Sequence, residues 1–315
     1  MKEIGGYLEL DRLSNKNYHK NAISLNTGRN AFVYLARAKK IKKVYIPYYL
    51  CASVSNVCKR ENIDFEYYNI DKNFFPVFNK SLNSNEYLYI VNCFGQLQKK
   101  EILFYKKQFG NIILDNVQAF FDSPIKGVDT IYSCRKFFGV PDGAYLVSDA
   151  CHLDFPTDTS IERMHHILGR LDSGSASKYF ADFQTSEESL NTLPVCYMSK
   201  LTHALLSNID YEAVYKKRNE NWETLHKSLS KINPLFLKKP RGPYMYPFYC
   251  ANGEAVRKAL ISKKIYIPML WSNVLQLDDC VIEKDFAVNI LPLPVDQRYN
   301  KEDMRQIVEI LKINL

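Results

Sequence analysis

Short β-forming runs alternate with helix-length segments through the first half of the chain. Five runs predict strands, at residues 43–47, 65–68, 87–92, 111–115 and 130–133. Ahead of them, Phe32, Leu35 and Ala36 recur at helical spacing within 29–38, which predicts an amphipathic helix. Because strands that alternate with helices pair in parallel, we expect this half to be an α/β domain with a mostly parallel sheet.

The second half begins with polar sequence of helical character, from about residue 150 to Leu229. A smaller α/β unit is predicted after it, with strands at 246–250 and 265–268 and helices at 253–262 and 301–311. This change of rhythm places a domain boundary near residue 205. Residues 1–205 then form a large domain and residues 206–315 a small one.

The charge balance bears on partners. Basic residues exceed acidic ones by 42 to 34, a formal net charge of +8, but they occur in small groups separated by acidic residues. That pattern is typical of a solvated surface and lacks the basic stripe of a nucleic-acid binder. No apolar stretch reaches the roughly 18 residues of a membrane helix, and residues 1–6 lack the layout of a signal peptide. We expect a cytoplasmic protein that acts on small molecules, without nucleic-acid or membrane partners.

Metal and disulfide chemistry find little support. The eight cysteines are scattered without a CxxC pair, and the six histidines form no HExxH motif and no cluster with ligand spacing. Free thiols and no metal site are the expectation.

Polar residues follow two consecutive predicted strands. Asp115 closes the run 111–115, and Lys136 comes three residues after the run 130–133. Ligands of parallel α/β domains bind outside the carboxyl ends of the strands, so both side chains are candidates for a site. Each also has a simpler interpretation, Asp115 as a turn or helix-capping residue and Lys136 as a surface lysine.

Several motifs occur together in a fixed order. They are GYLEL at 6–10, TGRNA at 27–31, VYIPYY at 44–49, VNCFGQ at 91–96, DNVQA at 115–119, SCRKFFGVPDGA at 133–144 and LPLPVDQRY at 291–299. In this joint order the chain resembles the DegT/DnrJ/StrS family of sugar aminotransferases, which use pyridoxal phosphate. The resemblance implies the fold type I architecture, with a seven-stranded, mostly parallel sheet and a smaller C-terminal α/β domain. It also implies a homodimer with active sites at the subunit interface.

Particular residues acquire roles from the same resemblance. Lys136 is expected to form a Schiff base with the cofactor aldehyde and then to move protons. Asp115 is expected to keep the pyridine nitrogen protonated, with its own pKa lowered by that cation, while Gln118 faces the ring hydroxyl. The cofactor phosphate is assigned to a predicted helix start and a strand end, namely to Gly28, Arg29, Asn30 and Ser133. Without a ligand, Thr27 and Gly28 are simply a helix cap.

The sequence departs from the family pattern in three places. Ile131 stands where relatives carry a phosphate-binding hydroxyl, for which Ser133 is the substitute. Cys51 stands where an aromatic residue usually stacks on the cofactor ring. The stretch 195–199 lacks the asparagine through which relatives reach the phosphate of the partner subunit. These losses affect phosphate and substrate contacts more than the Schiff base.

The implied function is transfer of an amino group from an amino acid such as glutamate to a nucleotide-linked keto sugar, as in the synthesis of cell-surface polysaccharides. One alternative is a family member that binds the cofactor or a sugar nucleotide without turnover, as a regulatory or scaffold protein. A sugar dehydratase is another, but dehydratases of this fold carry a histidine where this chain has Lys136.

Overall fold

The computed structural model describes residues 10–11 and 17–315 of the chain. Within this part, eight strands form one sheet in the order β1-β8-β7-β6-β5-β2-β3-β4. The strands are β1 (Ile23–Leu25), β2 (Lys43–Pro47), β3 (Asp64–Ile70), β4 (Pro76–Val77), β5 (Glu86–Val91), β6 (Ile112–Asp115), β7 (Asp129–Ser133) and β8 (Ala144–Val147). The central pairs are parallel and the pairs made by β4 and β8 are antiparallel. The predicted α/β class is confirmed, but the sheet has eight strands where the resemblance implied seven.

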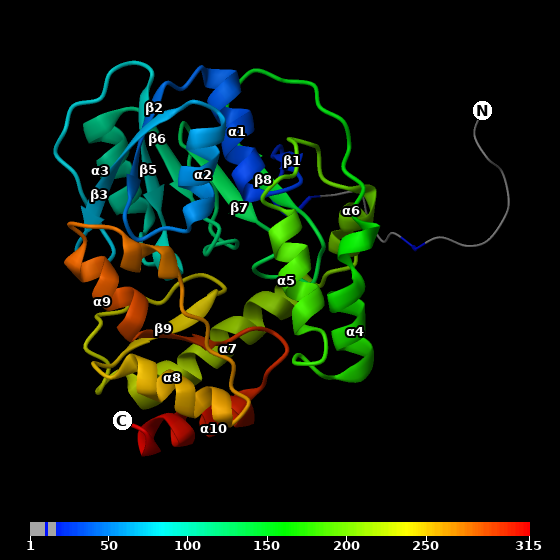
Figure 1. Ribbon diagram of the computed structural model, residues 1–315, viewed down its shortest axis with the longest axis vertical. Coiled ribbons are helices and arrows are strands. Elements are labelled where there is room, and N and C mark those ends of the chain that lie inside the picture. Colours follow the sequence, from blue (N-terminus) through cyan, green and yellow to red (C-terminus); the bar gives the residue numbers. More distant parts are fainter. Residues whose placement is uncertain (1–9, 12–16) are drawn as a thin grey trace, which may run out of the picture.

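The five predicted strands and the first helix are confirmed to within one or two residues at most ends. Their central positions, such as Ile46, Leu88 and Ile113, are fully or almost fully buried, as expected of a parallel sheet covered on both faces. The covering helices near the chain start are α1 (Gly28–Lys39), α2 (Ala52–Arg60) and α3 (Lys99–Phe109) (Figure 1). Strands β1, β4 and β8 were not predicted, because they have only two to four residues each. Residues 6–9 of the GYLEL motif lie outside the described residues.

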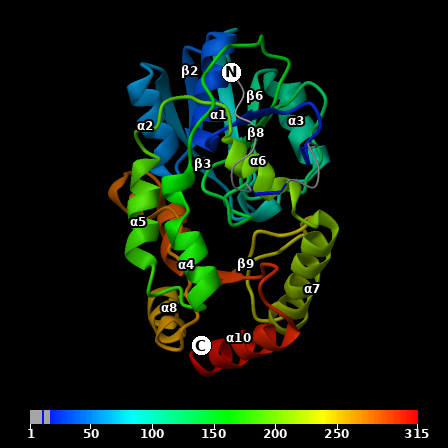
Figure 2. The same ribbon diagram turned by 90° about the vertical axis from the view of Figure 1, so that its right-hand side faces the viewer.

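A mainly helical stretch follows the sheet. Its helices are α4 (His165–Ser173), α5 (Phe180–Ser189), α6 (Lys200–Ser207) and α7 (Tyr211–Leu229). Figures 1 and 2 show α4 and α5 side by side at one flank of the molecule, between the sheet and the C-terminal elements. The remaining elements are β9 (Met245–Tyr249), α8 (Gly253–Ser262), α9 (Val281–Asn289), β10 (Ile290–Pro294) and α10 (Lys301–Ile313).

A second hydrophobic core is built from the C-terminal elements. Trp222 and Leu225 of α7, Leu260 of α8 and Leu311 of α10 are buried in it, around the antiparallel pair β9 and β10. The predicted strand at 265–268 is wrong. Lys264 turns the chain there with a φ of 62°, and Ile267 then packs into the core without pairing. The domain boundary near residue 205 stays a prediction.

Two findings concern broader expectations. No helix in the described part combines the length and the apolar character needed to cross a membrane. Among residues 10–11 and 17–315, no group of three or more His, Cys, Asp and Glu side chains has an arrangement that could hold a metal ion.

A histidine buried behind the sheet makes stability depend on pH. The His19 ring stacks on Tyr132, with ring centroids 3.8 Å apart, and its Nε2 lies 2.8 Å from the carbonyl oxygen of Phe120. Burial lowers the pKa of His19 from 6.5 to about 4. Below pH 6.5 the unfolded chain therefore binds a proton that the folded protein does not bind until about pH 4.

We expect the free energy of unfolding to fall by about 3 kcal/mol through this group as the pH decreases from 6.5 to about 4. Urea denaturation at pH 7 and at pH 4.5 measures the loss. In His19→Gln this part of the pH dependence should be absent, whereas replacing the exposed His152 in the same way should leave it intact. An equal pH dependence in wild type and His19→Gln would contradict the assignment.

Candidate functional site

The strand order brings Asp115 and Lys136 to one edge of the sheet. Asp115 is the last residue of β6 and is in register with Ile131 on the parallel neighbour β7. Ser133 ends β7, and Lys136 follows it by three residues. Parallel strands end at the same edge, so the carboxylate and the amine lie beside a common space.

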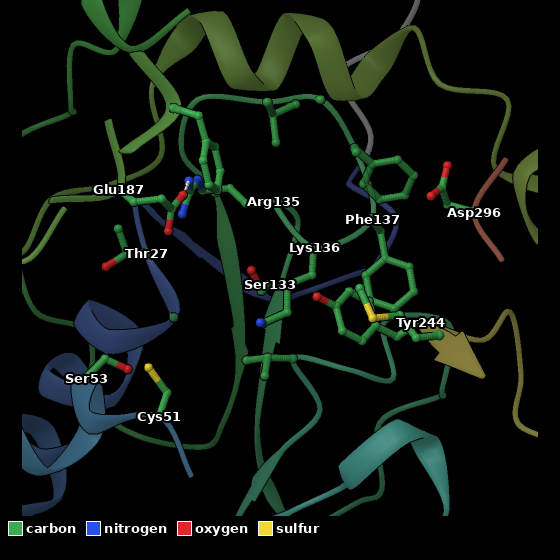
Figure 3. Close-up of a pocket in the computed structure, with 18 of the residues that line it drawn as sticks. Thr27, Cys51, Ser53, Ser133, Arg135, Lys136, Phe137, Glu187, Tyr244 and Asp296 are labelled. Carbon is green, nitrogen blue, oxygen red and sulfur yellow. Dashed lines mark hydrogen bonds and ion pairs between the residues drawn. The ribbon is translucent and has the colours of Figure 1, made fainter. Parts of the chain in front are cut away.

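That space is a cavity of about 970 Å³ bounded by the sheet edge, by α4 and α5, and by residues at the start of β9 and the end of β10. Five predicted site residues line it: Gly28, Arg29, Asp115, Ser133 and Lys136. In Figure 3 the side chain of Lys136 lies between Ser133 and Tyr244, and Thr27 and Cys51 lie across the cavity from Tyr244. Lys136 is the only lysine among the described residues that lines this cavity.

Lys136 is held in the cavity without a fixed partner. Its Nζ lies 5.3 Å from the centroid of the Tyr244 ring, a distance typical of a cation–π contact. Within the described part of the chain it has no hydrogen bond or ion pair. Electrostatic interaction with Tyr244, followed by smaller contributions from Cys51 and Asp115, raises the pKa of Lys136, while burial opposes the rise. These surroundings therefore favour the ammonium form of Lys136.

Asp115 is a buried carboxylate with two neutral donors. It accepts hydrogen bonds from the Tyr89 hydroxyl at 2.8 Å and from the backbone N–H of Val117 at 2.9 Å. Burial raises the pKa of Asp115, and these two hydrogen bonds and the charge of Lys136 only partly offset the effect. A bound cation such as a pyridinium would lower the pKa of Asp115 instead.

The start of α1 lies at the other end of the cavity. The Thr27 hydroxyl accepts a hydrogen bond from the backbone N–H of Asn30 at 3.1 Å and so caps the helix. Thr27, Gly28 and Arg29 line the cavity, so the helix N-terminus faces it and favours an anion there. Arg29 Nη1 donates to Asn191 Oδ1 at 2.6 Å, which ties the helix start to the segment after α5.

Two predicted cofactor residues do not line the cavity. Asn30 Nδ2 instead donates to Asn26 Oδ1 at 3.0 Å and to the Pro194 carbonyl at 2.8 Å. Gln118 Oε1 accepts from the backbone N–H of Phe94 at 2.8 Å, while its Nε2 is buried and has no partner among the described residues. Their roles in cofactor binding stay predictions.

Other cavity residues were missed by the sequence analysis. Arg135 forms an ion pair with Glu187 of α5, and Tyr244 comes from the chain just before β9. Arg135 stands beside Lys136 in a quoted motif, which was the available signal. Glu187 lies in a segment without any motif, so its position depends on tertiary packing alone. The motif at 291–299 also reaches the cavity, through Asp296, Gln297 and Arg298.

Comparisons with known proteins give different results for the sequence and for the fold. A scan against models of protein families finds no match, and a search of curated proteins finds no significant relative. Solved structures match the fold over most of the chain. A DegT DnrJ EryC1 StrS aminotransferase from Brucella abortus is 13% identical with a TM-score of 0.65, covering 93% of this chain and 86% of that one.

Two further structures extend the comparison. DesI, solved in the presence of its TDP-sugar product, is 12% identical with a TM-score of 0.66, over 94% of this chain and 80% of its own. A putative sugar aminotransferase from Streptococcus pneumoniae in its PMP form is 13% identical with a TM-score of 0.61, over 94% and 88%.

The protein thus has the fold of the type I pyridoxal-phosphate-dependent enzymes. Within that class its fold is the one found in the DegT-type sugar aminotransferases. The family resemblance drawn from the motifs agrees with this fold.

Proposed function

We propose that the protein is a pyridoxal-phosphate-dependent aminotransferase that moves an amino group from an amino acid such as glutamate to a nucleotide-linked keto sugar. The observation that carries the proposal is the placement of Asp115 and Lys136 at neighbouring strand ends in one cavity. The neighbours with PMP or a TDP-sugar product support the choice of cofactor and substrate class.

The residues present fit this cofactor. Asp115 is a buried carboxylate that lacks a fixed cation, and Lys136 is an amine without a fixed acceptor among the described residues. Gln118 lies three residues after Asp115, and its Nε2 is a buried donor without a partner among the described residues. When bound, pyridoxal phosphate supplies an aldehyde that combines with amines and a ring that withdraws electrons.

Each residue has a task that follows from its chemistry. Lys136 Nζ would bind the cofactor covalently and later accept and return a proton, which requires it first to lose the proton that its neighbours favour. Asp115 Oδ atoms hold a proton on the ring nitrogen. Gly28, Arg29 and Ser133 supply donors for the phosphate. Tyr244 orients the amine through its ring face.

The cellular setting and assembly are also proposals. We infer a homodimer working in the cytoplasm, with a large domain of residues 1–205 and a small domain of residues 206–315. The resemblance supports the dimer. The hydrophobic core that Trp222, Leu260 and Leu311 form among the C-terminal elements supports the division.

Borohydride labelling tests the cofactor site. After incubation with pyridoxal phosphate, reduction should leave a phosphopyridoxyl group on the peptide that carries Lys136, identified by mass spectrometry. Prior incubation with glutamate should reduce this labelling, because the amino group of the donor then occupies the cofactor. Labelling absent from Lys136, or spread evenly over surface lysines, would contradict the proposal.

A further inference from the structure

A carboxylate lies at the anion-binding end of the cavity. Glu187 of α5 forms an ion pair with Arg135, and it also interacts electrostatically with Arg29, Lys136 and His166. In Figure 3 its carboxylate points to Arg135 on the side of the cavity where Thr27 lies. One side chain of the protein therefore sits among the cations that would receive an anionic ligand.

Arg135 has binding capacity that the protein leaves unused. Its side chain is mostly buried, and its Nε is a buried donor without a partner in the described part of the chain. A guanidinium can bind a phosphate through two parallel N–H groups. Because Arg135 is adjacent to Lys136 and lines the cavity, this fork could bind a phosphate at the start of α1 once Glu187 leaves Nη2.

We propose that Arg135 is an anion-binding residue of the cavity and that Glu187 occupies its guanidinium until a phosphate group displaces the carboxylate. The inference rests on the proposed function for the identity of the ligand, since the phosphate is that of pyridoxal phosphate. The anion site itself depends only on the charges in the cavity. Like charges at close range repel, so the Glu187 carboxylate and a bound phosphate oppose each other.

The displacement has a structural consequence for α5. The Arg135–Glu187 ion pair connects this helix to the loop after β7. The hydrogen bond from Arg29 to Asn191 connects the residues just beyond the helix to the start of α1. Release of Glu187 breaks the ion pair and leaves the hydrogen bond. A phosphate therefore loosens the α4–α5 segment while it fills the cavity.

Binding of inorganic phosphate to the protein without cofactor tests the proposal by calorimetry. Glu187→Gln should bind phosphate about tenfold more tightly, and Arg135→Gln about tenfold more weakly, than wild type. Glu188→Gln is the matched control, because it removes the same charge from an exposed neighbour on the same helix. If Glu187→Gln weakens phosphate binding or behaves like Glu188→Gln, the displacement is wrong.

Further arms separate the sources of the anion. Pyridoxal phosphate should follow the pattern of phosphate across the variants, whereas pyridoxal without its phosphate should bind all of them equally. If a nucleoside diphosphate responds and pyridoxal phosphate does not, Arg135 binds the nucleotide and the assignment to the cofactor is overturned. Failure of borohydride labelling at Lys136 with an intact phosphate response would reject the aminotransferase and keep the anion site.

Limited trypsin digestion gives an independent readout. The rate of cleavage after Arg170 and Lys178 measures how firmly α4 and α5 are held against the rest of the protein. Phosphate should speed this cleavage in wild type. It should have little effect in Glu187→Gln, because this variant lacks the ion pair with Arg135. Protection of these bonds by phosphate in wild type would show that the ion pair persists, and would overturn the displacement.

Discussion

Replacement of Lys136 by alanine should lower the rate of amino transfer from glutamate by about 10³-fold. Lys136 is the only lysine among the described residues that lines the cavity, so the variant lacks both the amine that binds the cofactor and the base that moves the proton. Rapid-mixing absorbance with saturating pyridoxal phosphate measures the half-reaction directly. The cofactor should still bind through its phosphate, because Gly28, Arg29 and Ser133 remain.

Chemical rescue makes the interpretation specific. A small primary amine added to Lys136→Ala should enter the vacated space and restore part of the rate, in proportion to its concentration. The exposed Lys126, changed to alanine, should leave the rate unchanged. A half-reaction that proceeds normally in Lys136→Ala would remove this residue from the chemistry.

Replacement of Arg218 by alanine should lower the free energy of unfolding by about 3–5 kcal/mol. Arg218 is 2% exposed. Its guanidinium donates to Gln297 Oε1 at 2.9 Å, to the Pro243 carbonyl at 2.9 Å and to the Phe137 carbonyl at 3.1 Å. The loss leaves Gln297 Oε1 and the Pro243 carbonyl without this donor, while the Phe137 carbonyl keeps a hydrogen bond from Gln297 Nε2 at 2.8 Å. It also opens a cavity between the second core and the loop that carries Lys136.

Urea denaturation at pH 7 measures this loss. Lys216→Ala on the same helix is the control, because Lys216 is exposed, and its effect should stay within about 0.5 kcal/mol. Arg218→Lys keeps the charge but not the planar fork, so it should recover only part of the stability. A loss below about 1 kcal/mol in Arg218→Ala would show that water replaces the guanidinium at no great cost.

Local pattern and motif order predicted much of this molecule. The central strands are continuous apolar runs, and a buried parallel strand needs little else to be recognised. Asp115 and Lys136 could be named as candidate site residues because they lie at the ends of predicted strands. The short strand β8 was missed because four residues carry too little pattern, and the predicted strand at 265–268 failed because pairing depends on a partner that sequence does not identify.

Some contacts at the site were not predicted for a similar reason. Arg135 and Glu187 are 52 positions apart in the chain, so only tertiary packing brings them together. Asn30 was assigned to the cofactor by its place in a motif, yet its side chain is occupied by Asn26 and Pro194. A motif fixes the residue type at a position but does not show which neighbours will claim its hydrogen bonds.

The register of β6 and β7 bears on how far such a sequence can diverge. Asp115 and Ile131 are fixed opposite each other by ladder hydrogen bonds, while the exposed turn residues Lys126 and Gly127 in the connection do not set the spacing of the strand ends. Insertions and deletions at that turn can accumulate without moving the carboxylate relative to the lysine. Selection then acts on a handful of strand-end positions, so that two chains with about one residue in eight in common can retain the same architecture.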